Sequence, residues 1–196
     1  PVTVPDVVGM VQGDAEAEIT TTGLAVGAVT TQCSDTVPAG SVISQSPAGG
    51  ASVPPGTAVD LTVSTGPCPV TVPDVVGMAQ GNGEAEITSA GLAVGTVNTQ
   101  CSDTVPAGSV ISQSPGAGAS VPPGTAVDLT VSTGPCPVTV PDVVGQTSID
   151  SAVSLILAGL TVGSVAQVCS DTVPGGSVIS QSPGAGASVP PGTIVD

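Results

Sequence analysis

The residues best suited to chemistry form a short run of cysteine, serine and acid. Cys33, Ser34 and Asp35 are consecutive, and the same three residue types return at residues 101–103 and 169–171. Such a thiol becomes a nucleophile when an adjacent base or cation activates it. The chain has no His, Lys or Arg, so we interpret the run as a disulfide cysteine followed by a Ser-Asp turn. We predict no catalytic residue and no enzyme activity.

The run belongs to a repeat that organises the whole chain. Val4–Gly9 returns as Val72–Gly77 and as Val140–Gly145, and the cysteines keep the same period of 68 residues. Such periods indicate tandem copies of one small unit. We predict three domains: residues 1–68, 69–136 and 137–196, the last without its final strand. We expect either a longer array around these repeats or a neighbouring chain that supplies the missing strand, and we favour the array.

The composition restricts the partners of the chain. It has 15 Asp and Glu residues, a net charge of −15 and no aromatic residue. A chain without cations has nothing to replace the counterions of a nucleic acid, and anionic membrane surfaces repel it. It also offers no cleavage site to proteases that need Lys, Arg or aromatic side chains, which favours an extracellular location. No basic leader or membrane-spanning run is visible, so we expect no membrane insertion.

The acids are interpreted as structural rather than metal-binding. Ca²⁺ needs a cluster of oxygen ligands, but the group of Asp14, Glu16 and Glu18 is reduced to Asp150 in the third repeat. Acids near a helix N-terminus are favourable without any ligand. Three other acids recur in every repeat and are interpreted as acceptors at turns and strand ends: Asp6, Asp35 and Asp60. We predict no metal site and no cofactor.

Each repeat is predicted to have an α+β fold. Residues 58–64 alternate apolar and polar as a strand does, and Gly23 is placed to end a helix. We expect one helix packed on a three-stranded antiparallel sheet, with a short N-terminal extended segment. The expected ranges are 2–8 for the extended segment, 14–22 for the helix, 24–31, 42–45 and 58–64 for the strands, and 47–57 for a Pro- and Gly-rich loop.

The helix of the third repeat has the clearest pattern. Ser148 is expected to be its N-cap, because a Ser oxygen accepts hydrogen bonds from the first free amides. Ala152, Leu155 and Ile156 are expected to share its inner face.

In this order, the motifs of each repeat resemble the PASTA domain. They are Val-Pro-Asp-Val-Val-Gly at 4–9, Gly-Leu at 23–24, Val-Gly-x-Val at 26–29, Ser-Asp at 34–35, Val-Pro-x-Gly at 37–40, Val-Ile-Ser-Gln-Ser-Pro at 42–47 and Gly-Thr-x-Val-Asp-Leu-x-Val-Ser-x-Gly at 56–66. The resemblance implies small extracellular α+β modules of bacteria, known in tandem on serine/threonine kinases and penicillin-binding proteins. It also implies binding to cell-wall muropeptides, although the basic and aromatic side chains expected to help such binding are absent here.

The paired cysteines depart from the family pattern and suggest covalent reinforcement. A domain of about 68 residues buries only about 60% of its unfolded surface, and a disulfide across a loop of about 35 residues contributes about 4 kcal/mol. Strands that run up, down and up favour pairs within a repeat: Cys33–Cys68 and Cys101–Cys136, with Cys169 left over. The alternative ties each junction to the next repeat: Cys68–Cys101 and Cys136–Cys169. Pairing between chains is a third option.

Two functions remain. The main prediction is a structural protein, a rigid rod, stalk or filament on or outside a bacterial cell, because the repeats are nearly identical and their junction, 66–69, is stiffened by two prolines. Its partners would be copies of itself or adjacent repeats. The alternative is a peptidoglycan-binding ectodomain of a kinase or wall-synthesis protein. Both place the chain outside a bacterium, secreted or at the cell surface.

Overall fold

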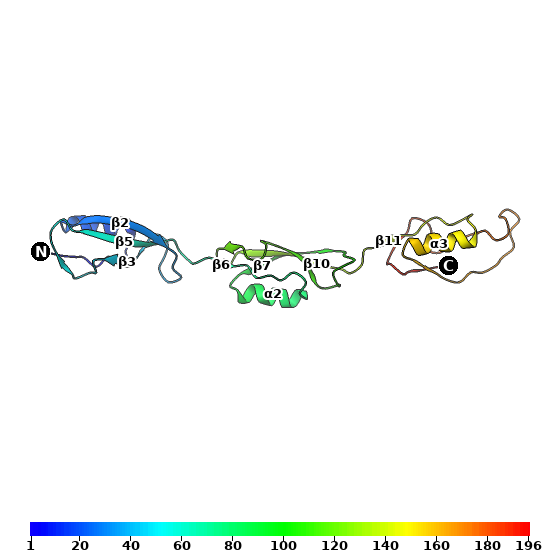
Figure 1. Ribbon diagram of the computed structural model, residues 1–196, viewed down its shortest axis with the longest axis horizontal. Coiled ribbons are helices and arrows are strands. Elements are labelled where there is room, and N and C mark those ends of the chain that lie inside the picture. The colour runs from blue at the N-terminus through cyan, green and yellow to red at the C-terminus, as the bar shows by residue number, and fades with distance from the viewer. The chain divides into compact units, whose positions relative to one another are not determined.

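The computed structural model describes residues 1–196 as three copies of one small α+β unit (Figure 1). The first repeat contains β1 (Val2–Thr3), α1 (Gln12–Thr21), β2 (Ala25–Gln32), β3 (Val42–Ser46), β4 (Ser52–Val53) and β5 (Ala58–Ser64). The second contains β6 (Val70–Thr71), α2 (Gln80–Ser89), β7 (Ala93–Gln100), β8 (Val110–Ser114), β9 (Ser120–Val121) and β10 (Ala126–Ser132). The third contains β11 (Val138–Thr139), α3 (Ser148–Leu157), β12 (Thr161–Val162), β13 (Ser188–Val189) and β14 (Ile194–Val195). None of the three helices has the length and apolar character that crossing a membrane requires.

The main sheet of the first repeat confirms the α+β prediction and corrects the predicted strand pairing. The strand order is β2-β5-β3, so β5 lies in the middle (Figure 1). β3 pairs with β5 in antiparallel fashion as predicted, but β2 pairs with β5 in parallel, so the all-antiparallel sheet is wrong. The reason is that β5 is the most buried strand and takes the centre. β2 and β5, which run in the same direction, are therefore neighbours.

A second, two-stranded sheet replaces part of the predicted loop. Within residues 47–57, β4 pairs with β1, with Val53 opposite Val2. The Val4 amide donates to the Ala51 carbonyl at 2.8 Å, and the Gly50 amide donates to the Val4 carbonyl at 2.8 Å. The Pro- and Gly-rich segment therefore holds the N-terminal segment in place.

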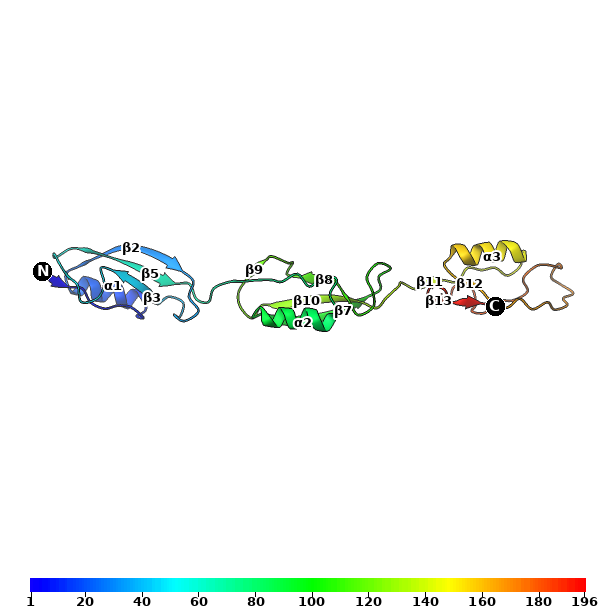
Figure 2. The ribbon, with the colours of Figure 1, turned by 60° about the horizontal axis from the view of Figure 1, so that its bottom comes forward.

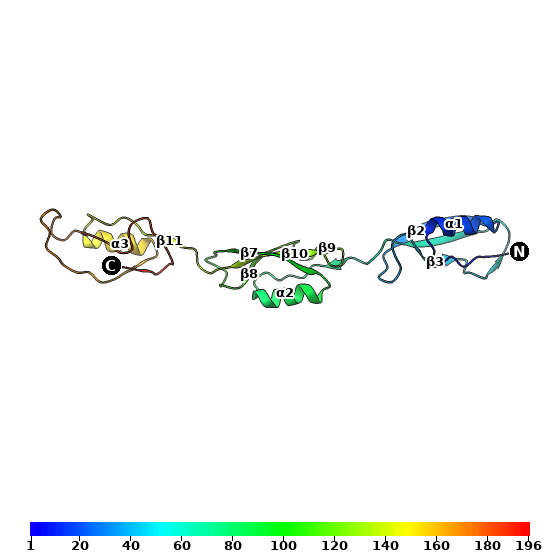
Figure 3. The same cartoon turned by 180° about the vertical axis from the view of Figure 1, so that it is seen from behind.

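The core lies between α1 and the main sheet. Figures 2 and 3 show α1 against this sheet from two sides. Its inward residues Ala15 and Ile19 are fully buried, and so are alternate residues of β5. The core of the repeat consists only of small and aliphatic side chains: Val4, Val7, Ala15, Ile19, Leu24, Val42, Val59, Leu61 and Val63. Each buried Val, Leu or Ile side chain contributes only about 1.5–3 kcal/mol, so the repeat depends on many small contributions.

The start and the inner face of α3 differ from the prediction. Thr147, rather than Ser148, is the N-cap, and its side chain accepts a hydrogen bond from the Asp150 amide at 3.2 Å. Leu155 is buried as expected, but its inward partner is Ser151, and Ile156 is 64% exposed. Residues four apart share a helix face, and Ile156, the neighbour of Leu155, is turned away from that face.

Two glycines of the first repeat should respond in opposite ways to replacement by Ala. A Cβ at Gly27 would overlap Asp60 Oδ1 and lie 3.2 Å from the Asp60 backbone nitrogen, so Gly27→Ala should lower the free energy of unfolding by about 2 kcal/mol. Gly13, in α1, has open space at its Cβ position, and Gly13→Ala should raise that free energy by about 0.5–1 kcal/mol. Urea denaturation of both variants checks the signs. Equal effects would show that the close approach of Asp60 to β2 does not constrain residue 27.

Candidate functional site

The structure places four of the five cysteines in disulfides within repeats. β2 and β5 are parallel neighbours, so the residues that follow them meet at one end of the sheet. There Cys33 and Cys68 are joined, with their Cα atoms 4.9 Å apart. Cys101 and Cys136 are joined in the same way at 4.8 Å. Cys169 has an exposed free thiol, and neither junction pair is formed.

The serine and acid beside Cys33 hold the local turn. Ser34 Oγ accepts hydrogen bonds from the Thr36 amide at 3.3 Å and the Val37 amide at 3.0 Å. Asp35 Oδ1 accepts from the Cys68 amide at 2.9 Å. These bonds confirm the Ser-Asp turn. Both side chains hold backbone amides at the end of the sheet where the disulfide lies.

The acids of α1 lie on the exposed side of the helix and do not converge on one point. Glu16 Oε1 accepts a hydrogen bond from Gln12 Nε2 at 2.7 Å, while Asp14 and Glu18 are exposed. No group of three or more Asp, Glu, Cys or His residues is arranged to hold a metal ion.

Asp60 is the acid that the fold positions most closely. It lies on β5, and its Oδ1 accepts a hydrogen bond from the Ala28 amide of β2 at 2.7 Å. Gly27 permits this approach because it has no side chain. The bond recurs in the other repeats, from the Thr96 amide to Asp128 at 2.6 Å and from the Ser164 amide to Asp196 at 2.7 Å. Asp60 is a backbone acceptor as predicted, but it lies within β5 rather than at a turn or a strand end. It fixes one charge on the outer face of each sheet.

A shallow polar surface surrounds Asp60 on the side of the sheet away from α1. It encloses about 270 Å³, and we call it the polar sheet face: Ala28, Thr30, Ser44, Gln45, Ser46, Asp60, Leu61 and Thr62. Thr30 Oγ1 and Thr62 Oγ1 lie 3.3 Å apart across two strands. Hydroxyls and a carboxylate can bind the hydroxyl, amide and amine groups of a polar ligand. In a chain of net charge −15, the field favours cationic groups over anionic ones.

The sequence did not predict the polar sheet face, nor the role of Gln45, whose side chain ties β3 to the N-terminal segment. Gln45 Oε1 accepts from the Val7 amide at 2.7 Å, while its Nε2 donates to the carbonyls of Pro5 at 2.9 Å and Pro47 at 3.1 Å. Gln181 makes the corresponding bonds in the third repeat. The signal was present, because this glutamine recurs in every Val-Ile-Ser-Gln-Ser-Pro motif.

Comparison with known proteins identifies the family. The PASTA domain family model matches residues 2–65, 70–133 and 138–196. The chain belongs to the PASTA family. The resemblance seen in the motifs is therefore confirmed, as is the tandem arrangement of the repeats.

The PASTA relatives of this chain include bacterial kinases. A probable serine/threonine-protein kinase of Corynebacterium efficiens is 38% identical over 193 residues, which are 98% of this chain and 29% of that kinase. The serine/threonine-protein kinase PknB of Mycobacterium tuberculosis is 32% identical over 197 residues, covering 100% of this chain and 31% of the kinase. The three-PASTA-domain structure of a Ser/Thr kinase from Staphylococcus aureus matches with a TM-score of 0.58 at 29% identity, covering 100% of this chain and 96% of that one.

This PASTA chain therefore corresponds to one part of such kinases. It spans less than a third of the length of these kinases, and the catalytic domain of the kinases lies outside the matched part. A second solved structure, 30% identical over 98% of this chain with a TM-score of 0.51, is the extracellular region of the Ser/Thr kinase PrkC from Staphylococcus aureus. The PASTA regions of these kinases lie outside the bacterial cell, which confirms the predicted cell-surface location.

Proposed function

We propose that this chain is the cell-wall-binding extracellular region of a bacterial serine/threonine kinase, with residues 1–68, 69–136 and 137–196 as its binding units. The observation that carries the proposal is the 38% identity of 98% of the chain to one such kinase. The similar proteins favour this alternative over the predicted rod or filament, because they include a serine/threonine kinase and the extracellular region of another such kinase. PASTA domains bind peptidoglycan, and this is the ligand that we assign.

The polar sheet face is the binding surface that we propose. Peptidoglycan presents sugar hydroxyls, peptide amides and amines, and the hydroxyls and carboxylate around Asp60 complement these groups. The chain has no cation or aromatic ring, so it lacks the groups that pair with carboxylates or stack on sugars. The proposal therefore predicts recognition of the amine- and hydroxyl-bearing parts of the wall polymer.

Co-sedimentation of the purified chain with peptidoglycan sacculi tests the proposal. We expect saturable binding. The double variant Asp60→Asn with Asp128→Asn should raise the dissociation constant of each altered repeat about fivefold, because each change replaces a charged hydrogen-bond acceptor by a neutral one. Asn retains an oxygen that can accept from the Ala28 amide, so the sheet should stay intact. The matched control, Asp14→Asn with Glu18→Gln, removes two exposed charges from α1.

Two outcomes would count against the proposal. Recovery of the unmodified chain in the supernatant at all sacculus concentrations would contradict wall binding itself. An equal loss in the α1 control would indicate general charge attraction rather than a site at the polar sheet face.

A further inference from the structure

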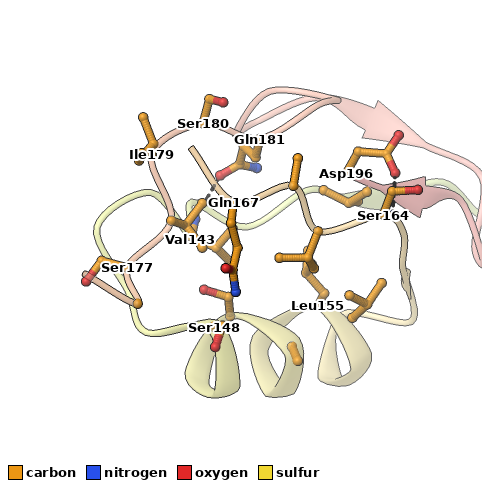
Figure 4. A pocket seen from close by; sticks show the side chains of 18 of the residues that line it. Val143, Ser148, Leu155, Ser164, Gln167, Ser177, Ile179, Ser180, Gln181 and Asp196 are labelled. Carbon is orange, nitrogen blue, oxygen red and sulfur yellow. Dashed lines mark hydrogen bonds between the residues drawn. The ribbon is translucent and has the colours of Figure 1, made fainter. Parts of the chain in front are cut away.

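The outer side of α3 carries large apolar side chains that face solvent. Four of them, spaced three or four residues apart, share one face of the helix, and we call them the α3 stripe. Its members are Ile149, Val153, Ile156 and Leu157, which are 76%, 51%, 64% and 83% exposed. The inner side of the helix is distinct, because Leu155 is 4% exposed and points to the side where Val143 and Ser164 lie (Figure 4).

The α3 stripe is found in the third repeat alone. The equivalent residues are small or polar in the other two helices: Gly13, Ala17, Thr20 and Thr21 in α1, and Gly81, Ala85, Thr88 and Ser89 in α2. All of these residues are exposed as well. The exposure of this helix face therefore belongs to the fold of every repeat, and only the third repeat places large apolar side chains on it.

The sequence of the third repeat departs from the second chiefly in this helix. All residues of α3 differ from their counterparts in α2, whereas residues 169–193 differ from 101–125 only at Gly175. Helix stability does not account for the change, since Val153 stands where α1 and α2 have Ala, a better helix former. Burial does not account for it either, because the stripe faces away from the core. Large exposed apolar patches mark interaction sites.

The charge around the α3 stripe restricts its partner. α1 carries three acids, whereas α3 carries only Asp150, whose Oδ2 accepts a hydrogen bond from Thr147 Oγ1 at 2.8 Å. A basic partner would favour the acids that this face lacks, and a chain of net charge −15 is repelled by an anionic lipid surface. Two copies of the chain repel each other least where acids are fewest. A second α3 stripe is apolar and poor in charge, so it complements the first.

We propose that the α3 stripe is a contact surface between two copies of this chain, with the same four residues on both sides of a two-fold axis. Four partly exposed aliphatic side chains offer roughly 200–300 Å² per copy, compared with about 800 Å² per partner in a standard interface. The contact is therefore weak and reversible, with a dissociation constant of about 0.1–1 mM. It gains strength where chains are held side by side, because their effective concentration is higher. The proposal does not depend on wall binding.

Sedimentation equilibrium of the full chain tests this contact. Interference optics are needed, because the chain has no aromatic residue that absorbs light. Between about 0.02 and 2 mM, the average mass should rise from that of a monomer toward that of a dimer. The triple variant Val153→Ala, Ile156→Thr and Leu157→Thr carries the residues that α1 has at these positions, so its helix should still form. It should raise the dissociation constant at least about tenfold.

A matched control separates the α3 stripe from general apolar adhesion. Val8→Thr with Val11→Thr changes two side chains of the first repeat that are 50% and 59% exposed, and it should leave the dissociation constant unchanged. A chain that stays monomeric over the whole concentration range would overturn the proposal, as would an equal loss in this control. Co-sedimentation with phosphatidylcholine vesicles addresses the other occupant. Vesicle binding by a monomeric chain, lost in the triple variant, would assign the stripe to a lipid surface instead.

Discussion

Replacing Cys33 and Cys68 together by Ser lowers the free energy of unfolding of the first repeat by about 4 kcal/mol. The disulfide closes a loop with a sequence separation of 35 residues, so its removal increases the conformational entropy of the unfolded chain. The loss is large for this repeat, since small domains have only about 5–15 kcal/mol in total and its core contains no aromatic side chain. Hydrogen exchange of the full chain measures the effect, with the second repeat as an internal reference.

Two controls separate the disulfide from the side chains. Cys169→Ser changes an exposed free thiol and should leave the exchange rates of all repeats unchanged. Digestion of the alkylated, non-reduced chain after Asp and Glu should give peptide 19–35 linked through Cys33 and peptide 151–171 with a free Cys169. The reverse pattern, with 19–35 free and 151–171 linked, would establish the junction pairing and contradict the expected effect.

Local patterns in the sequence were sufficient to predict the elements but not their neighbours. The alternation of residues 58–64 predicted β5, because side chains point to opposite faces along a strand. It carries no information on which strand lies beside β5, and so the parallel pairing with β2 was not predicted. The pairing of β1 with β4 involves two residues on each side, which is too short to leave a periodic pattern. Both errors concern contacts between segments that are distant in the sequence.

The candidate site shows the same limit. The recurrence of Asp60 correctly indicated a backbone acceptor, but its partner, the Ala28 amide, is 32 positions away. Gln45 is bonded to residues 38 and 40 positions away as well as to its near neighbour Pro47. A single repeated glutamine reveals neither its partners nor the polar sheet face that it lines. The strand order has to be known before these residues can be placed together.

Gln45→Glu should lower the free energy of unfolding of the first repeat by about 3 kcal/mol. Glu retains an oxygen to accept from the Val7 amide, but it replaces the Nε2 donor by an oxygen that faces the carbonyls of Pro5 and Pro47. Two carbonyls then lose a partner and meet a negative charge. Since Val7 belongs to the buried core, the N-terminal segment should detach first. Urea denaturation measures the total loss, and hydrogen exchange should become faster at the Val7 amide before it does in β5.

The matched control is Gln32→Glu, which makes the same change in charge at an exposed position near the end of β2. It should alter the free energy of unfolding by less than about 0.5 kcal/mol. If both variants lost the same stability, the added charge alone would account for the effect, and the three hydrogen bonds of Gln45 would have no special weight. A large loss confined to Gln45→Glu would show that this side chain joins the N-terminal segment, β3 and the following loop into one cooperative unit. In that case Gln45, which lines the polar sheet face, also holds the N-terminal segment that contributes Val4 and Val7 to the core.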